Sequence, residues 1–175
     1  MPKKTFSSQD YNSPDGMLTS IWGPPMWHAL HTISFNYPIN PIKDDKTTYY
    51  NYFKSLQGVL PCKYCRDNLK DNYKKLSLNK SVFKNRDTLS RFVYNLHEMV
   101  NKRLGKISNL TYTQVRDRYE NFRARCIDNK NSKLEKGCTN SLYGIKGKCV
   151  MDIVPKSSQR KTLNIHSSCK IKKKK

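Results

Sequence analysis

The sequence predicts an all-α fold: a four-helix bundle plus a short fifth helix, with a flexible basic C-terminal tail. Apolar side chains recur at helical spacings of three and four from Trp22 to about Cys126, and this pattern fades beyond Cys126. The breaks between the periodic stretches are short, so successive helices are expected to lie antiparallel. Each apolar stripe has to be buried against another stripe, which a helical bundle achieves. No stretch of the chain is convincing as a strand.

The first two helices flank the connection "NYPINPIKDD". In "WGPPMWHALHTISF" the two prolines are expected in the first helical turn, which tolerates proline. Four later side chains share one face of this helix: Trp27, Leu30, His31 and Ser34. Asp44 or Asp45 is expected to cap the second helix, which "GVLP" ends.

The remaining three helices follow at short intervals. The third is expected in "CKYCRDNLKDNYKKL", with Pro61 suited to its first turn. Asp87 is expected to cap the fourth helix and Gly105 to end it. The apolar stripe of this fourth helix consists of Leu89, Phe92, Val93, Leu96, Val100 and Leu104. A fifth helix is expected from near Thr111 through Phe122.

The formal net charge of +21 is large for 175 residues, and it is densest near the C-terminus. Residues 127–175 contain 13 Lys and Arg against three Asp and Glu. Such a charge attracts nucleic acids, anionic membranes and acidic proteins without choosing among them. No apolar stretch reaches the roughly 18 residues that span a bilayer, and the N-terminus lacks the apolar segment of a secretory signal. A cytosolic protein that is not secreted, with thiols usually kept reduced, is therefore expected.

The pair Cys62 and Cys65 in "GVLPCKYCRDNL" admits three interpretations. A zinc site needs four ligands, and the other cysteines form no second CxxC. These other cysteines are Cys126, Cys138, Cys149 and Cys169. Two buried cysteines acting as small hydrophobes are the second interpretation. A redox-active dithiol is the third, because the cations Lys63 and Arg66 and the start of a helix favour a thiolate at Cys62.

Two further pairs of residues predict a cofactor site. Trp27 and His31 are four residues apart on one helix, and His97 and Asn101 are four apart on another. A single histidine in an apolar stripe is usually a core residue, but two such pairs in one small bundle favour a shared site. Indole rings that stack on a planar ring, imidazole and amide groups that bond to its edge, and a lysine for phosphate suit a dinucleotide. The sequence contains neither GxGxxG nor a P-loop.

Three motifs in this order and spacing resemble the Erv/ALR family of FAD-linked sulfhydryl oxidases. They are W-G-x-x-x-W-x-x-x-H from Trp22 to His31, P-C-x-x-C from Pro61 to Cys65, and H-x-x-V-N-x-x-L-G-K from His97 to Lys106. The resemblance implies a small helical bundle, often a homodimer, that binds FAD, oxidises dithiol proteins to disulfides and reduces oxygen to hydrogen peroxide. It divides the chain into an N-terminal extension (1–19), an Erv/ALR-like FAD-binding sulfhydryl oxidase domain (20–126) and a basic Cys-containing tail (127–175).

The resemblance also implies a role for each matching residue. Cys62 would be the outer cysteine that exchanges with the substrate, and Cys65, as a thiolate, would pass the electron pair to the flavin. The residues implied to line the flavin from the first helix are Trp22, Gly23, Trp27 and His31. Those implied to hold the adenosine and phosphate end are His97, Val100, Asn101 and Lys106. "VRDRY" resembles the family's late helix, which adds Arg118 and Tyr119 as candidates.

The sequence departs from the family pattern at two places. Glu98 follows His97 where the family often has Asn, which puts one adenine-side hydrogen bond in question. The chain also lacks the disulfide that cellular members usually carry from the position of Tyr94 to a cysteine after Gly-Lys, and this loss is a trait of the viral branch. Together with the Lys-, Asn- and Tyr-rich composition, it suggests a large cytoplasmic DNA virus as the source. The host cytoplasm or the virion is then the expected location.

The basic tail has several candidate roles. Family members often use a distal cysteine pair as a shuttle, and Cys138 and Cys149 are candidates because Gly144 and Gly147 lie between them. Thiols without a shuttle role are an equal alternative. Thioredoxin-like or virion proteins are candidate substrates, and no metal is expected in the oxidase. The rival hypothesis is a basic nucleic-acid-binding or virion structural protein with a zinc-bound CxxC, although a charge run is more often a solvated extension.

Overall fold

The computed structural model describes residues 7–11, 16–127 and 137–142. The chain divides into two units, Met1–Glu120 and Asn121–Lys175. The first unit contains four long helices: α2 (Thr19–Asn36), α3 (Lys43–Val59), α4 (Lys63–Lys75) and α5 (Arg86–Arg103). It also contains three short ones: α1 (Ser8–Tyr11), the 3-10 helix η1 (Lys80–Phe83) and α6 (Tyr112–Glu120). None of the helices in these described ranges is long and apolar enough to cross a membrane.

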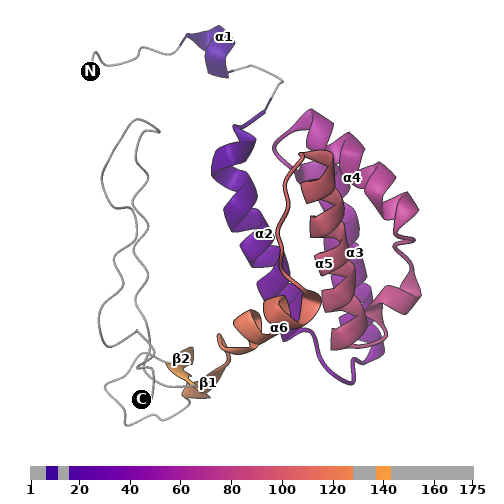
Figure 1. Cartoon of the computed structure of the whole chain (residues 1–175), viewed down its shortest axis with the longest axis vertical. Helices are drawn as coiled ribbons and strands as arrows, with labels where there is room; N and C mark the ends of the chain where they lie inside the picture. Colours follow the sequence, from indigo (N-terminus) through magenta and orange to yellow (C-terminus); the bar gives the residue numbers. More distant parts are fainter. Residues whose placement is uncertain (1–6, 12–15, 128–136, 143–175) are drawn as a thin grey trace. The chain divides into compact units, whose positions relative to one another are not determined.

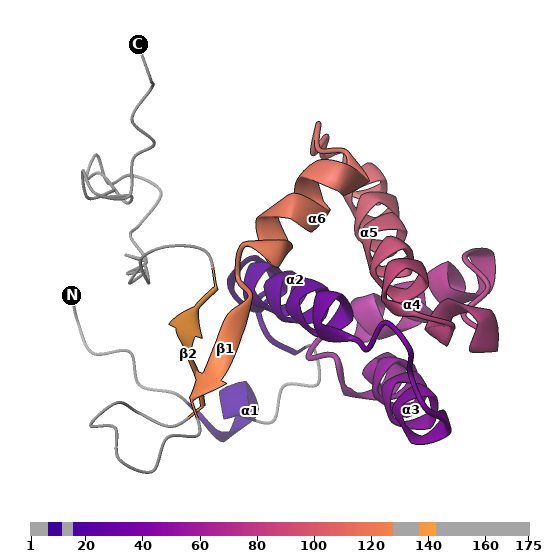
Figure 2. The ribbon, with the colours of Figure 1, turned by 90° about the horizontal axis from the view of Figure 1, so that it is seen from below.

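The four long helices form a bundle. Helix α2 packs against α5, α3 packs against α4, and α4 also contacts α5 (Figure 1). Helix α6 lies across both α2 and α5, as the two views in Figures 1 and 2 show. The predicted all-α class, a four-helix bundle plus a short fifth helix, is confirmed.

The second unit contains two strands that the sequence did not predict. They are β1 (Ala124–Ile127) and β2 (Gly137–Ser141), which pair antiparallel (Figure 2). Ala124 pairs with Ser141, and Ile127 pairs with Gly137. The expectation that no stretch of the chain forms a strand was therefore wrong for residues 124–127 and 137–141. These strands form by pairing with each other, and a local sequence pattern does not reveal the pairing partner. The remaining tail residues lie outside the described part of the chain.

The core is built from the inward faces of the four helices and η1. Its most deeply buried side chains are Tyr37, Phe53, Phe83, Leu89, Val93 and Leu96. Tyr37 also donates a hydrogen bond from its hydroxyl to the carbonyl oxygen of Phe83, at 2.9 Å. The predicted stripe of α5 is buried up to Leu96, but Leu104 is 60% exposed. The prediction for Leu104 was wrong because the helix ends at Arg103 and the chain turns away from the core there.

Helix α5 ends as the sequence predicts. The N–H of Lys106 donates to the carbonyl oxygen of Asn101 (2.9 Å), and the N–H of Gly105 donates to that of Lys102 (3.2 Å). These two bonds form a Schellman motif, which needs a positive φ that glycine adopts without steric cost. Gly105 has φ +66°. The chain then runs back along α5 to reach α6 (Figure 1).

The first two helices begin at positions that differ in part from the expected ones. Helix α2 starts at Thr19, so Pro24 and Pro25 lie in its second turn and not in its first. The earlier start is stabilised by the Leu18 carbonyl oxygen, which accepts the N–H of Ile21 at 3.0 Å. The N-cap of α3 is Ile42, so the expected cap at Asp44 or Asp45 was wrong in position. Asp45 instead contributes to the cap from the third residue of the helix, where its carboxylate accepts the N–H of Ile42 at 2.9 Å.

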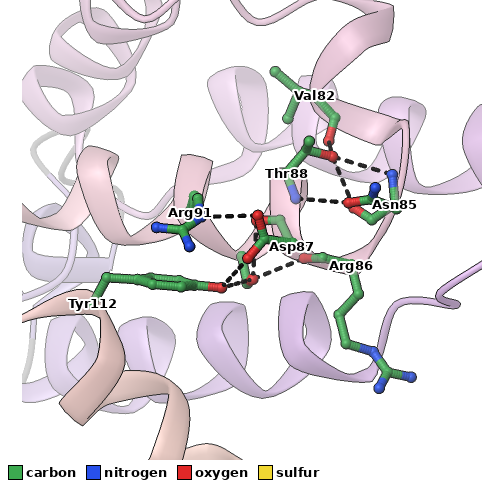
Figure 3. Close-up of polar contacts among 8 residues, drawn as sticks. Val82, Asn85, Arg86, Asp87, Thr88, Arg91 and Tyr112 are labelled. Atoms are coloured by element: carbon green, nitrogen blue, oxygen red, sulfur yellow. Dashed lines mark hydrogen bonds and ion pairs between the residues drawn. The ribbon is translucent and has the colours of Figure 1, made fainter.

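The starts of α4 and α5 differ from the expectation by one or two residues. Cys62 precedes α4 as its N-cap, so Pro61 lies outside the first turn of that helix. Helix α5 is capped by Asn85 and not by Asp87. The Asn85 side chain accepts the N–H of Thr88 (3.0 Å), and the Thr88 hydroxyl accepts the N–H of Asn85 (3.1 Å; Figure 3). This reciprocal pair satisfies two backbone donors that a carboxylate at position 87 cannot reach.

Asp87 instead attaches α6 to α5 (Figure 3). Its carboxylate accepts hydrogen bonds from Arg91 Nε (2.8 Å) and from the Tyr112 hydroxyl (3.2 Å), and the Arg91 guanidinium lies 4.0 Å from the centre of the Tyr112 ring. The hydrogen bond from Arg91 is the main reason that the pKa of Asp87 is lowered. This contact fixes the start of α6, the helix that carries Tyr119.

Replacing Asn85 with alanine should destabilise the protein by about 1 kcal/mol, because the first turn of α5 loses its capping acceptor. Denaturant unfolding measures this change. Asn51→Ala, at an exposed position inside α3, is the matched control and should change the free energy of unfolding by less than about 0.5 kcal/mol. Equal effects of the two substitutions would contradict the capping role.

Candidate active site

Cys62 and Cys65 lie at the start of α4 as a pair of free, half-buried thiols. Cys62 is the N-cap of the helix, and its Sγ accepts the N–H of Cys65 at 3.2 Å. The turn before the pair is held by two bonds to the carbonyl oxygen of Leu60, from the N–H of Cys62 (2.8 Å) and from the guanidinium of Arg66 (2.5 Å). Arg66, one of the cations noted in the sequence, therefore supports this turn directly.

The environment of Cys65 favours its protonated form. Burial is the largest cause, and the hydrogen bond and charge of Cys62 add to it, so that the pKa of Cys65 is raised to about 12 against a smaller opposing effect of Arg66. This differs from the expectation of a thiolate at Cys65. The two sulfurs thus have unlike surroundings: Cys62 Sγ accepts a helix N–H, whereas Cys65 holds its proton.

A cluster of aromatic and imidazole rings joins α2, α5 and α6. The indole of Trp27 stacks on His97 with ring centres 4.1 Å apart and an interplanar angle of 4°. His31 Nε2 and His97 Nδ1 are hydrogen-bonded at 3.0 Å. Tyr119 stacks on His31 (5.1 Å) and on Phe35 (5.4 Å). The helices therefore bring together four predicted cofactor residues that are far apart in the sequence: Trp27, His31, His97 and Tyr119.

His28 and Phe35 belong to the same cluster, although neither was predicted as a cofactor residue. His28 Nδ1 lies 3.2 Å from the hydroxyl oxygen of Tyr119, within hydrogen-bonding distance. A signal for His28 was present in the sequence, since it precedes His31 by three positions and so lies near it on the helix. Phe35 follows His31 by four positions, and only the packing of α6 shows that it meets Tyr119.

Burial keeps the two central histidines neutral. It is the main cause that lowers the pKa of His31 to about 4, and the neighbouring His97 and His28 lower it further. The pKa of His97 is also lowered, mainly by burial. The buried Nδ1 of His31 has no hydrogen-bond partner among the described residues. A buried nitrogen of this kind is ordinarily paired, so His31 is suited to bond to a polar edge of a bound ring.

Of the predicted cofactor residues, Lys106 lines an open cleft of about 690 Å³. Its lining includes Glu98, Lys102 and Lys106, together with the chain from Gly105 to Thr111. Asn101 donates from its side-chain amide to the Glu98 carboxylate at 3.0 Å, so the residue that departs from the family pattern engages the candidate asparagine. Val100 is half-buried on the same turn. Two lysines at an open cleft suit a phosphate-bearing group.

The other candidates are spread more widely. Trp22 is half-buried, and its indole N–H bonds to the carbonyl oxygen of Met17 at 3.0 Å. Gly23 lies in α2 with open space where a Cβ would be, and Arg118 is exposed on the last turn of α6. Cys138 lies in β2 of the second unit and is disulfide-bonded. Its predicted partner Cys149 lies outside the described residues.

These features fit an FAD better than a structural core. An indole and neutral imidazoles with one orphan ring nitrogen suit a planar ring system, and lysines at an open cleft suit phosphates. Residues 24–120 match the model of the Erv1 / Alr family. The chain belongs to the Erv1/Alr family.

Relatives of this Erv1/Alr chain occur in viruses and in yeast. A protein of Acanthamoeba polyphaga mimivirus, named as a probable FAD-linked sulfhydryl oxidase, is 37% identical over 57% of this chain and 68% of its own length. The FAD-linked sulfhydryl oxidase of African swine fever virus (isolate Pig/Kenya/KEN-50/1950) is 25% identical over 61% and 87%. The mitochondrial FAD-linked sulfhydryl oxidase ERV1 of Saccharomyces cerevisiae is 27% identical over 57% and 51%.

Solved structures of yeast Erv1 share the fold. The crystal structure of the yeast Erv1 core has a TM-score of 0.54 and 22% identity, over 65% of this chain and 92% of that chain. The FAD binding domain of Erv1 from Saccharomyces cerevisiae has a TM-score of 0.52 and 25% identity, over 59% and 95%. The bundle of this chain is therefore the helical fold of the family.

The buried histidines predict a loss of stability in mild acid. His31 is protonated in the unfolded chain below pH 6.5 but in the folded chain only below about pH 4, so stability should fall as the pH decreases between these values. The loss attributable to His31 is about 3 kcal/mol. Unfolding of the FAD-free protein at pH 7 and pH 4 measures it.

The matched comparison for this test is His31→Phe against Phe35→Leu. The first variant removes the titrating group and keeps a ring, so its stability should depend less on pH than that of the unaltered protein. The second changes packing in the same cluster and should keep the full pH dependence. An unchanged pH dependence in His31→Phe would contradict the assignment.

Proposed function

We propose that this protein is an FAD-dependent thiol oxidase that forms disulfide bonds in protein substrates. The observation that carries the proposal is the Cys62–Cys65 dithiol at the start of α4 in a chain of the Erv1/Alr family. The relatives named above are FAD-linked sulfhydryl oxidases, and one structural neighbour is an FAD binding domain. Family membership favours this function over a nucleic-acid-binding protein with a zinc-bound CxxC.

Cys62 is the cysteine that exchanges with the substrate in this proposal. A substrate thiolate attacks Sγ of Cys62 in the Cys62–Cys65 disulfide, a mixed disulfide forms, and the sulfur of Cys65 is released and takes up a proton. A second substrate thiolate then attacks the mixed disulfide and releases Cys62. The substrate leaves as a disulfide and the enzyme holds a dithiol. Because the pKa of Cys65 is raised to about 12, its sulfur is protonated in this dithiol state.

Re-formation of the Cys62–Cys65 disulfide removes two electrons and two protons from the pair. The sulfur of Cys62 is hydrogen-bonded to the thiol of Cys65 and can accept its proton. Bound FAD would supply the two-electron acceptor, with oxygen as the final oxidant and hydrogen peroxide as the product. Trp27, His31 and His97 would hold the flavin ring, with Trp22, Gly23 and Tyr119 beside it. Lys106, Val100, Asn101 and Arg118 would hold the adenosine and phosphate end.

The assembly and surroundings of the enzyme belong to the same proposal. A homodimer is supported by membership of the Erv1/Alr family. The viral relatives support the host cytoplasm or the virion as the location, with virion or thioredoxin-like dithiol proteins as substrates. Cys138 takes part in a disulfide, which supports a role for it as a shuttle cysteine.

The purified protein should be yellow, and its flavin absorbance should bleach when a dithiol is added without air. Cys62→Ser and Cys65→Ser should each keep the flavin but lose oxygen-dependent oxidation of dithiothreitol by about 10³-fold or more, because one sulfur cannot form the disulfide. Absorbance and oxygen uptake measure the two effects. A colourless protein with stoichiometric zinc, or full turnover by Cys65→Ser, would contradict the proposal.

The shuttle role of Cys138 predicts a difference between small and large substrates. Cys138→Ser should leave dithiothreitol oxidation unchanged, because a small dithiol reaches Cys62 directly. Oxidation of a reduced thioredoxin-like protein should fall about tenfold, because a tethered carrier that raises the local thiol concentration is lost. Equal rates for the protein substrate in the variant and the unaltered enzyme would exclude the shuttle.

A further inference from the structure

The segment that precedes α2 reaches the turn in front of the redox pair. Gly16 forms an isolated antiparallel bridge with Cys62. The N–H of Met17 donates to the carbonyl oxygen of Pro61 at 2.7 Å. The carbonyl oxygen of Met17 accepts the indole N–H of Trp22 at 3.0 Å. The backbone of one residue is therefore bonded both to the turn of the reactive cysteine and to a proposed flavin-lining indole.

Glycine is required at position 16 for two physical reasons. Gly16 has φ +96°, a conformation that residues with a side chain rarely adopt. A Cβ at this position would overlap the carbonyl oxygen of Pro61 and would lie 3.0 Å from Pro61 C and 3.1 Å from Cys62 Cα. These are backbone atoms, so no side-chain rotation relieves the overlap. The close approach of the two backbones depends on the missing side chain.

Backbone contacts hold Met17 in place, and its side chain does not. That side chain is 71% exposed, so burial of apolar area contributes little to its position. The other bonds of the turn, from Cys62 and Arg66 to Leu60, lie within residues 60–66. The Met17 bonds differ from these because they tie the turn to α2.

We propose that the backbone of Met17 positions the redox pair relative to the Trp22 indole, and that Gly16 permits the close approach this requires. The inference rests on the proposed function and gives a role to residues 16–18, which the sequence assigned to an N-terminal extension. Transfer of electrons and thiol exchange both depend on reacting atoms held at short distance, and small displacements slow such steps strongly. The backbone of Met17, bonded both to the turn and to the indole, therefore fixes the position of the Cys62–Cys65 pair relative to Trp22.

Gly16→Ala tests the proposal, with Gly58→Ala as the matched control. Each variant adds one methyl group, at Gly16 in the segment before α2 or at Gly58 near the end of α3. A Cβ at Gly58 meets nothing within 4 Å. Gly16→Ala should release the bridge to Cys62. In the reduced, FAD-free protein, alkylation of Cys62 by iodoacetamide, followed by mass spectrometry, should be about fivefold faster, the ratio that corresponds to loss of one ordinary hydrogen bond. Gly58→Ala should show the unaltered rate.

The second measurement is the rate at which dithiothreitol bleaches the flavin without air, per bound flavin. It should fall about tenfold in Gly16→Ala and remain unchanged in Gly58→Ala, because misplacement of the pair slows the step after substrate exchange. Faster alkylation with slower bleaching supports the proposal. Faster alkylation with unchanged bleaching would show that the segment merely covers Cys62, and it would overturn the positioning role, as would equal behaviour of the two variants.

A third variant breaks the same contact from the neighbouring residue. Met17→Pro removes the N–H donor to Pro61, puts the ring Cδ in the place of the amide hydrogen and leaves glycine at position 16. It should reproduce both effects, and unaltered rates in this variant would overturn the proposal. Circular dichroism establishes whether each variant is folded. If Gly16→Ala does not fold, the two rates of Met17→Pro test the proposal. If the unaltered protein bound no flavin, the proposed function would fail, while the alkylation ratio would still decide whether Met17 holds the turn.

Discussion

The packing of α5 against α2 is the interaction on which the other features of the site depend. Leu89, Val93 and Leu96 are almost fully buried on α5, and each such side chain contributes about 1.5–3 kcal/mol through removal of apolar area from water. This packing brings His97 on α5 against Trp27 and His31 on α2. The same pair of helices forms the surface on which α6 lies, so the position of Tyr119 depends on it as well.

Burial also sets the chemistry of the groups in the site. It lowers the pKa of His31 and His97, so two imidazoles remain neutral and offer uncharged hydrogen-bonding atoms near neutral pH. It raises the pKa of Cys65 and keeps that thiol protonated. One physical effect, the cost of a charge in an apolar environment, thus acts in opposite directions on a base and on an acid. Neutral rings and a neutral inner thiol suit a site that moves electron pairs together with protons.

Hydrogen bonds between distant segments complete the site. Asp87 holds Tyr112 and thereby the start of α6, while Met17 joins the turn before Cys62 to Trp22. In both cases a residue outside the recognised motifs determines where a motif residue lies. The sequence assigned Asp87 to a helix cap and Gly16 to an extension, because local patterns report capping and periodicity but contain no information on which distant segment is the partner.

The sequence by itself determined the all-α class, the number of long helices, the end of α5 at Gly105 and the place of the CxxC pair at the start of a helix. These follow from short-range rules: the 3.6-residue period, the left-handed conformation that glycine adopts, and the fixed spacing of CxxC. Only the tertiary structure decided that His28 and Phe35 meet Tyr119, that Leu104 is exposed, that β1 pairs with β2, and that Cys65 retains its proton. Each of these depends on contacts between residues far apart in the chain, and burial, ring stacking and pKa values arise from those contacts.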